Sequence, residues 1–152
     1  MQPTNPELSG KKPIRILVVE DVSNVATVLK ARLESYGYKI CDVANTGQKA
    51  IDDTLRWKPD LVLMDIMLEG EMNGIEAAAK IQKKMNVPII YLSCLSDQKV
   101  MERAIETNPY GYIVKPYDSA ELRFSIENAL RKHLQHLERE ARIADLEKTQ
   151  LK

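Results

Sequence analysis

Between Ile14 and about His133, short runs of apolar residues alternate with stretches in which apolar residues recur every three or four positions. A short apolar run bounded by turn residues is typical of a buried strand, and the longer spacing is typical of a helix that faces a core. Their alternation predicts βαβ units and a parallel sheet covered by helices on both faces. Strands are expected at 15–19, 39–44, 60–64, 88–92 and 110–114.

The residues between these runs predict where the helices begin and end. Gly37 is placed to end the first helix, and Trp57-Lys58-Pro59 to end the second. Residues able to accept hydrogen bonds from the first helical amides precede three helices: Asn45 or Thr46, Asn73, and Asp118 or Ser119. The sequence thus predicts an α/β protein with a doubly wound, five-stranded parallel sheet and five helices, the last of them extended.

The last predicted helix contains no Gly or Pro from Asp118 to the end of the chain, so it is expected to continue without a break. Its apolar residues repeat with heptad spacing at Leu130, Leu134, Leu137, Ala141, Ala144 and Leu151. Such residues supply the a and d positions of a short coiled coil, although about three heptads is near the lower limit for this pattern. Dimerisation through this seam and a solvated helical extension or linker both stay open.

These patterns divide the chain into three segments. Residues 1–13 contain several prolines and few apolar residues, so they are predicted to form a disordered leader. Residues 14–133 are predicted to form one domain, and residues 134–152 a helical extension or linker.

Composition limits the functions that this domain can have. With 152 residues and 44% hydrophobic residues, the chain can bury the core of one ordinary domain. Its formal net charge is zero, so no electrostatic attraction to nucleic acid or to an anionic membrane is implied, and a protein partner is expected. No apolar run approaches the ~18 residues that a membrane span needs. Cys41 and Cys94 lie among apolar residues and are predicted to be buried thiols in a reducing compartment, so a cytoplasmic location is expected.

Polar side chains follow four of the predicted strands. They are Glu20 and Asp21, Asp65, Ser93, and Lys115. Because the carboxyl ends of parallel strands form one edge of the sheet, these side chains are expected to converge there. Each has an ordinary explanation by itself, since strand-end acids often cap helices and a lone serine often forms a turn. Their common position makes coincidence a poor explanation of the whole set.

Three carboxylates, a hydroxyl and an amine suggest phosphoryl chemistry. Glu20, Asp21 and Asp65 are hard oxygen ligands in an open crevice, which suits Mg²⁺. A carboxylate can attack phosphorus and form an acyl phosphate, and Asp65 is the best nucleophile candidate because it ends the middle strand alone. Lys115 and Ser93 could then bind the phosphoryl oxygens. The chain is interpreted as a phosphoryl-accepting switch.

Four motifs carry a resemblance to a known family. They are VVED at 18–21, LVLMDIML at 61–68, IIYLS at 89–93 and YGYIVKP at 110–116. Through them, residues 14–133 resemble the receiver domain of two-component response regulators, the CheY-like family. The resemblance implies a flavodoxin-like sheet with strand order 2-1-3-4-5.

The resemblance also implies roles for individual residues. Asp65 would accept a phosphoryl group from a phosphohistidine on a sensor histidine kinase. Mg²⁺ would be held by Glu20 or Asp21, by Asp65 and by the main-chain carbonyl of Met67. Ser93 and Lys115 would bind phosphoryl oxygens, the Lys115-Pro116 bond would be cis, and Tyr112 would be the aromatic switch residue.

Two segments depart from the family pattern. The loop 68–73 has Leu68 where the family usually has proline, and it takes a longer path to the following glycine. Cys94 stands where a small alanine or glycine is common, so it is expected to change access to the acyl phosphate and its lifetime.

The expected function is a signalling phosphoacceptor, capable of catalysing its own phosphorylation and dephosphorylation, with a downstream protein target and no DNA-binding output domain in this chain. Homodimerisation is considered through two surfaces, the fourth helix with the fifth strand and helix, or the extended last helix. Two alternatives are considered as well: an unphosphorylated structural or dimerisation module, and an aspartyl-phosphate phosphatase. The phosphatase would need a second carboxylate two residues after Asp65, where Met67 stands.

Overall fold

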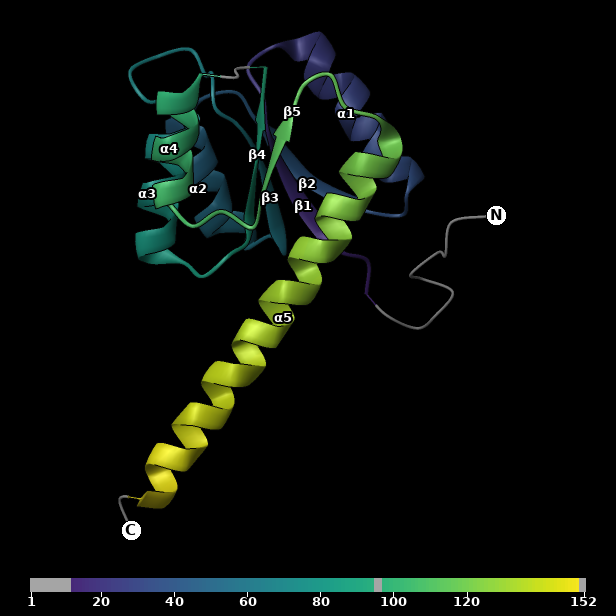
Figure 1. Cartoon of the computed structure of the whole chain (residues 1–152). Coiled ribbons are helices and arrows are strands. Elements are labelled where there is room, and N and C mark those ends of the chain that lie inside the picture. Colours follow the sequence, from purple (N-terminus) through teal and green to yellow (C-terminus); the bar gives the residue numbers. More distant parts are fainter. Residues whose placement is uncertain (1–11, 95–96, 151–152) are drawn as a thin grey trace.

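The computed structural model describes residues 12–94 and 97–150. In this part of the chain, five parallel strands form one sheet in the order β2-β1-β3-β4-β5. The strands are β1 (Arg15–Val19), β2 (Lys39–Ala44), β3 (Leu61–Asp65), β4 (Ile89–Ser93) and β5 (Gly111–Val114). The helices are α1 (Ser23–Ser35), α2 (Gly47–Trp57), α3 (Gly74–Lys84), α4 (Gln98–Glu106) and α5 (Ser119–Gln150). The predicted fold class and strand order are confirmed (Figure 1).

Three strands differ from the prediction by one residue at one or both ends. β3 and β4 each start and end one residue later than predicted, and β5 starts at Gly111 instead of Tyr110. Asp65 and Ser93 are therefore the last residues of their strands and belong to the hydrogen-bonded sheet. Their backbones are held more rigidly than those of loop residues would be.

Alternate residues of the central strands supply two separate cores, because successive side chains of a strand point to opposite faces. One face carries Val62 and Met64 and is covered by α2, α3 and α4. The other carries Leu61 and Leu63 and is covered by α1 and α5. All five residues of β3 are buried, as expected for a parallel strand with helices on both faces.

The predicted helix caps are present. The Thr46 hydroxyl accepts a hydrogen bond from the Lys49 amide at 3.1 Å, and Asn73 forms a reciprocal capping box with Glu76. The Asp118 carboxylate accepts from the Glu121 amide at 2.7 Å. These bonds satisfy amides that have no partner within the helix.

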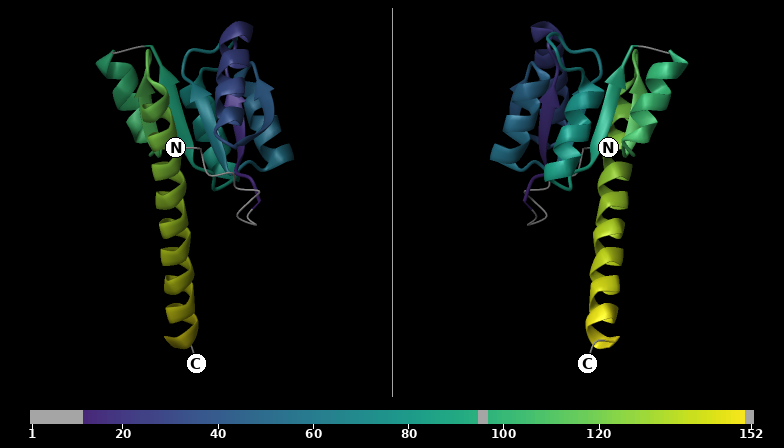
Figure 2. Two further views of the ribbon diagram at one scale, coloured as in Figure 1. Left: turned by 90° about the vertical axis from the view of Figure 1, so that its right-hand side faces the viewer. Right: turned by 90° about the vertical axis from the view of Figure 1, so that its left-hand side faces the viewer.

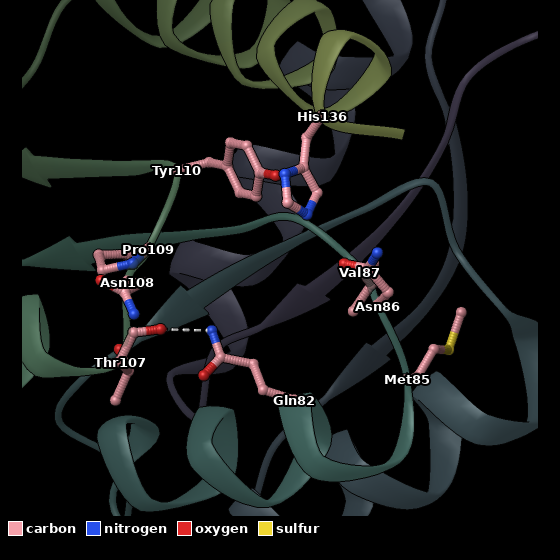
Figure 3. Close-up of a pocket in the computed structure, with 9 residues that line it drawn as sticks. All are labelled: Gln82, Met85, Asn86, Val87, Thr107, Asn108, Pro109, Tyr110 and His136. Atoms are coloured by element: carbon pink, nitrogen blue, oxygen red, sulfur yellow. Dashed lines mark hydrogen bonds between the residues drawn. The ribbon is translucent and has the colours of Figure 1, made fainter. Parts of the chain in front are cut away.

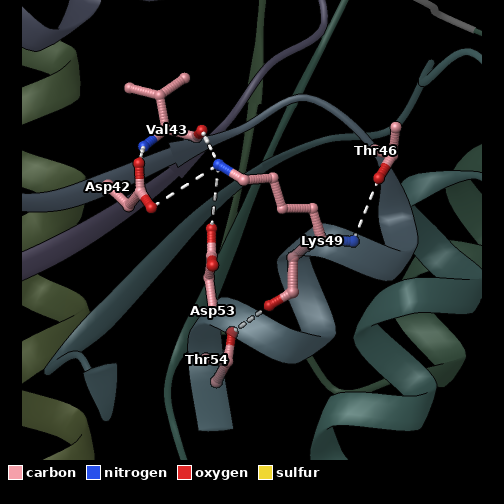
Figure 4. A network of polar contacts seen from close by, with 7 residues as sticks. Asp42, Val43, Thr46, Lys49, Asp53 and Thr54 are labelled. Carbon is pink, nitrogen blue, oxygen red and sulfur yellow. Dashed lines mark hydrogen bonds and ion pairs between the residues drawn. The ribbon is translucent and has the colours of Figure 1, made fainter. Parts of the chain in front are cut away.

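Lys49 ties α2 to the edge strand β2, as Figure 4 shows. Its Nζ donates to the carbonyl oxygen of Val43 at 2.8 Å and lies 3.6 Å from Asp42 Oδ2 and 3.4 Å from Asp53 Oδ2. Asp53 is only 6% exposed, so Lys49 supplies the positive charge that this buried carboxylate needs.

The last helix continues unbroken from Ser119 to Gln150, which confirms the prediction for the described residues. Its first turns pack on the sheet through Leu122, Ile126 and Ala129, whereas residues 134–149 are all exposed. This second half projects away from the sheet (Figure 2). Nearly all of the predicted leader and the last heptad residue, Leu151, lie outside the described residues, and the segment boundaries stay predictions.

Two further sequence expectations can be compared with the structure. Among the described residues, no helix has the length and apolarity that a membrane crossing requires. The prediction of two buried thiols is wrong for Cys94, which is exposed because the chain leaves the sheet directly after Ser93. Cys41 on the edge strand is partly buried, and burial raises the pKa of its thiol.

Candidate phosphoryl-transfer site

Parallel strand pairing brings the predicted site residues to one edge of the sheet. Glu20 directly follows β1, Asp65 ends β3, Ser93 ends β4 and Lys115 directly follows β5. The pairing registers match these ends, since Asp65 lies opposite Leu92 and Ser93 opposite Val114. The Lys115 amide also donates to the Ser93 carbonyl at 2.7 Å, which extends the β4–β5 pairing to the site.

The three predicted acidic residues form a compact cluster. One carboxylate oxygen from each of Glu20, Asp21 and Asp65 lies within 4.8 Å of the others. Glu20 is 4% exposed and Asp65 6%, while Asp21 is partly exposed at the mouth. Two carboxylates about 4 Å apart repel by roughly 4 kcal/mol at an effective dielectric constant of 20, so this cluster needs cations.

Lys115 supplies one of these cations. Its Nζ lies 3.1 Å from Asp65 Oδ2 and 3.3 Å from Glu20 Oε1. Burial by itself would lower the pKa of Lys115, but the carboxylates of Asp65 and Glu20 outweigh it and raise the pKa above its ordinary value. Lys115 therefore stays charged. The peptide bond that follows it, Lys115-Pro116, is cis, as the resemblance implied.

The single positive charge of Lys115 does not neutralise three carboxylates. The lack of positive charge is visible at Glu20. Burial, and then the neighbouring Asp65 carboxylate, raise the pKa of Glu20 to about 7, although Lys115 opposes the shift. Glu20 Oε2 is buried and has no hydrogen-bond partner among the described residues. An orphaned carboxylate oxygen beside two further hard oxygen donors fits a small divalent cation, so the residues present suit Mg²⁺.

The loop after β3 is held by the same acidic residues. The Asp65 Oδ1 atom accepts from the Met67 amide at 3.0 Å, and Asp21 Oδ2 accepts from the Glu69 amide at 3.0 Å. Leu68 packs partly against the core beneath α2 and α3. The unusual 68–73 segment is thus tied to Asp21 through Glu69, and the residue before it, Met67, is tied to Asp65. The role of the Met67 carbonyl as a metal ligand stays a prediction.

Comparison with known proteins shows the family to which this domain belongs. Residues 16–127 match the family model of the response regulator receiver domain. The chain belongs to this receiver domain family. Receiver domains are signalling modules of two-component systems and interact with histidine kinases and downstream effectors.

Several relatives and solved structures resemble this receiver domain. The transcriptional regulatory protein PdtaR of Mycobacterium tuberculosis is 34% identical over 134 residues, which are 88% of this chain and 65% of PdtaR. Response regulator ArlR of Staphylococcus aureus is 35% identical over 80% of this chain and 54% of its own length. The chain thus spans about half to two thirds of these curated relatives.

Among solved structures, the signal receiver domain of a modulated diguanylate cyclase from Desulfovibrio desulfuricans G20 is 36% identical with a TM-score of 0.78. The match covers 82% of this chain and 99% of that one.

Gly74 is a site residue whose role the sequence did not reveal. It begins α3, and its amide donates to the Ile66 carbonyl at 2.8 Å. A Cβ at this position would overlap the carbonyl oxygen of Asp65 and crowd the backbone of Ile66. Only glycine lets α3 start so close to the end of β3. The Asn73-Gly74 pair was visible in the sequence, but its spatial neighbour was not.

Tyr91 is a second such residue, and it contacts the predicted switch residue Tyr112. The two rings lie 6.4 Å apart, edge to face. Tyr91 is fully buried, and its hydroxyl lies 2.6 Å from Oγ1 of Thr107, directly after α4. Thr107 Oγ1 donates its one proton to the Ala104 carbonyl at 2.6 Å, so Tyr91 is the donor in the pair. In the sequence, Tyr91 is indistinguishable from the other apolar residues of its strand.

A pocket of about 570 Å³ lies at the opposite edge of the sheet, near the amino ends of β4 and β5 (Figure 3). Its walls include Asn86, Tyr110 and His136. Gln82 crosses its floor and donates to the Thr107 carbonyl at 2.6 Å. Because this pocket is separated from Asp65 by the length of the strands, it takes no part in the acidic site.

Proposed function

We propose that Asp65 accepts a phosphoryl group from a phosphohistidine of a sensor histidine kinase. The observation that carries this proposal is the cluster in which Lys115 Nζ lies 3.1 Å from Asp65 Oδ2 while the carboxylates of Glu20 and Asp21 lie within 4.8 Å. A nucleophilic carboxylate beside one fixed amine and two further metal-binding carboxylates is suited to phosphoryl transfer, where catalysis is mainly positioning and charge stabilisation.

In the proposed reaction, an Asp65 carboxylate oxygen forms a bond to phosphorus and the phosphorus–nitrogen bond of the phosphohistidine breaks. The electron pair of that bond stays on the imidazole nitrogen, and Asp65 becomes an acyl phosphate. Lys115 carries its charge on a flexible four-carbon side chain, so its Nζ would follow the negative charge from the carboxylate to a phosphoryl oxygen. The buried Ser93 hydroxyl, at the end of the neighbouring strand, is proposed to contact a second phosphoryl oxygen.

Mg²⁺ would be held by Glu20, Asp21 and Asp65, with the Met67 carbonyl as a further expected ligand. When bound, it supplies the positive charge that Lys115 alone lacks and reduces repulsion between the site and the incoming phosphoryl group. Glu20 must lose its proton to bind the ion, since only the carboxylate is a strong ligand.

Two alternatives are disfavoured by particular residues. A phosphatase that uses an aspartyl phosphate would need a second carboxylic acid two residues after Asp65, and the side chain there is the 55% exposed Met67. A module that is never phosphorylated would have no need for the buried and mutually repelling Glu20 and Asp65.

A surface for the kinase is available beside the site. Its histidine must reach Asp65, so the kinase must cover the surface next to the acidic cluster. Val22, directly after Asp21, is 51% exposed, and Val25 and Val28 on α1 are 40% and 60% exposed. We propose that these valines contact the kinase, because large exposed apolar side chains grouped next to a functional site are typical of protein interfaces.

A second surface is proposed for output. Large apolar side chains are exposed on α4, β5 and α5 at Ile105 (61%), Val114 (40%) and Phe124 (66%). Tyr112 lies in the same strand as Val114 and packs against Tyr91. Phosphorylation would shift the population of Tyr112 conformations and thereby change this face. A downstream protein or a second copy of the chain would bind to the changed face.

Incubation with acetyl phosphate and Mg²⁺ tests the phosphoacceptor directly. The intact mass of the wild-type chain should increase by one phosphoryl group, and chelation of Mg²⁺ should prevent the increase. Asp65→Asn should show no increase. Asp52→Asn, an exposed aspartate on α2, is the matched control and should behave as wild type. A mass increase in Asp65→Asn equal to that of wild type would refute the assignment.

A further inference from the structure

The exposed second half of α5 carries an apolar stripe that covers nothing in the described part of the chain. Leu134 (57% exposed), Leu137 (42%), Ala141 and Ala144 lie on one side of the helix with spacings of three and four residues. We refer to these four residues as the tail seam. Leu134 and Ala141 occupy a positions and Leu137 and Ala144 occupy d positions of a heptad repeat.

From Glu138 to Glu147, every residue at a position that flanks the tail seam is acidic, whereas the g position before Leu134 holds His133. In the same heptad frame, Glu138 and Asp145 occupy e positions, and Glu140 and Glu147 occupy g positions. All four are exposed. The basic residues of this stretch lie elsewhere, with Arg139 and Arg142 on the outer side of the helix and Lys148 at the next a position, where it ends the apolar part of the seam.

This charge pattern opposes pairing of the tail with itself. In a parallel pair, Glu140 of one helix would face Asp145 of the other, because g positions meet the following e positions. An antiparallel pair would place e beside e and g beside g, so acidic residues would again face acidic residues. Like charges in these positions disfavour pairing of the tail with the tail of a second copy of the chain.

The apolar residues point to the same conclusion. In a parallel, in-register self-pairing, Ala141 would meet Ala141 and Ala144 would meet Ala144, and layers of such small side chains bury little surface. An unlike helix can place larger apolar side chains against these alanines and cationic side chains beside the four acids.

We propose that the tail seam binds an amphipathic helix of a different protein, with large apolar residues along its own seam and Lys or Arg at the flanking positions. This inference does not depend on phosphorylation of Asp65. It concerns the tail alone and does not apply to the other dimerisation surface that the sequence suggested, which α4, β5 and the first half of α5 form.

Two synthetic helical peptides of equal length test the proposal with the full chain. Both carry Leu at a and d positions; one carries Lys at e and g, and the other Glu. Calorimetry should show that the Lys peptide binds at least about tenfold more tightly than the Glu peptide, with an affinity that falls as salt rises. Sedimentation should show no dimerisation through the tail, so that the chain alone and its Leu137→Asp variant have the same mass at every concentration.

Variants distinguish a fitted helix pair from charge attraction alone. Leu137→Asp should abolish binding of the Lys peptide, whereas Leu146→Asp, on the opposite side of the helix, should leave it unchanged. Exchanging all four flanking acids for Lys should reverse the preference to the Glu peptide. Circular dichroism of each variant checks that the tail stays helical. Equal affinity for the two peptides, binding that survives Leu137→Asp, or a dimer of the chain alone that Leu137→Asp dissociates would each overturn the proposal.

Discussion

The carboxyl edge of the sheet and the second half of α5 both concentrate acidic side chains, but they place them in different surroundings. Glu20 and Asp65 are nearly inaccessible to water, and the pKa of Glu20 rises to about 7. Glu138 and Glu147 are exposed on an isolated helix, where water solvates them and salt screens their repulsion. Because the first group is buried, it forms a site that requires cations. Because the second group is exposed, it needs no cation and instead influences which partner can bind. The same residue types therefore have different roles because their solvation differs.

The largest effect is expected from the backbone that supports the buried group. Gly74→Ala would drive a Cβ into the carbonyl oxygen of Asp65, where no flexible side chain can move aside. The expected loss of unfolding free energy is about 3 kcal/mol or more, together with impaired phosphorylation. Urea unfolding and the acetyl phosphate assay measure the two effects.

Gly70→Ala is the control for this change. Gly70 has a φ of 103°, but a Cβ added there would have no atom within 4 Å, so the cost should be near 1 kcal/mol and phosphorylation should persist. Equal losses for Gly74→Ala and Gly70→Ala would show that close packing at Asp65 is not the cause.

Glu20 should make metal-free stability depend on pH. A carboxyl group whose pKa is higher in the folded than in the unfolded state stabilises the fold fully below the unfolded pKa, and this contribution is lost as pH rises through the folded pKa. For a rise from 4.5 to about 7, the contribution of Glu20 to the unfolding free energy should fall by on the order of 3 kcal/mol between these pH values. Urea unfolding at a series of pH values, with and without Mg²⁺, measures it.

The comparison variant is Glu20→Gln, which keeps the shape and removes the titration. Its metal-free stability should fall less than that of wild type across this range, and added Mg²⁺ should stabilise it less at pH 8. Identical pH profiles for wild type and Glu20→Gln would mean that the buried carboxylate does not titrate as described.

A smaller effect is expected at the buried hydroxyl of Tyr91. Tyr91→Phe leaves the ring beside Tyr112 but removes the 2.6 Å hydrogen bond to Thr107. The unfolding free energy should decrease by about 1 kcal/mol. Tyr110→Phe removes a longer, 3.3 Å contact to His133 at a partly exposed position, and a loss below about 0.5 kcal/mol is expected. A larger loss for Tyr110→Phe would reverse the expected order.

The smallest effect is expected on the tail. Glu138→Gln and Glu147→Gln remove exposed charges that form no ion pair within residues 12–94 and 97–150, so each should change the unfolding free energy by less than about 0.5 kcal/mol. Thermal unfolding at low and high salt measures this. A change as large as that of Glu20→Gln would contradict the contrast between buried and exposed acids.

Much of the molecule follows from local sequence signals. Alternating apolar runs and helical spacings predicted the five strands and five helices, because these periods reflect which face of each element must avoid water. Thr46, Asn73 and Asp118 predicted helix starts, since a cap depends on neighbours only a few residues away. Convergence of Asp65 and Lys115 followed from one topological rule, that parallel strands end at a common edge.

Other features required the tertiary structure, because they depend on residues distant in the chain. The need for glycine at position 74 comes from the Asp65 carbonyl, and the exposure of Cys94 from its place just past the end of β4. Tyr91 resembles its apolar neighbours until its hydroxyl is seen beside Thr107. The sequence by itself determined which side chains meet at the carboxyl edge. Only the tertiary structure decided how deeply each is buried, and burial controls whether a carboxylate behaves as an ordinary charge or as one that demands a cation.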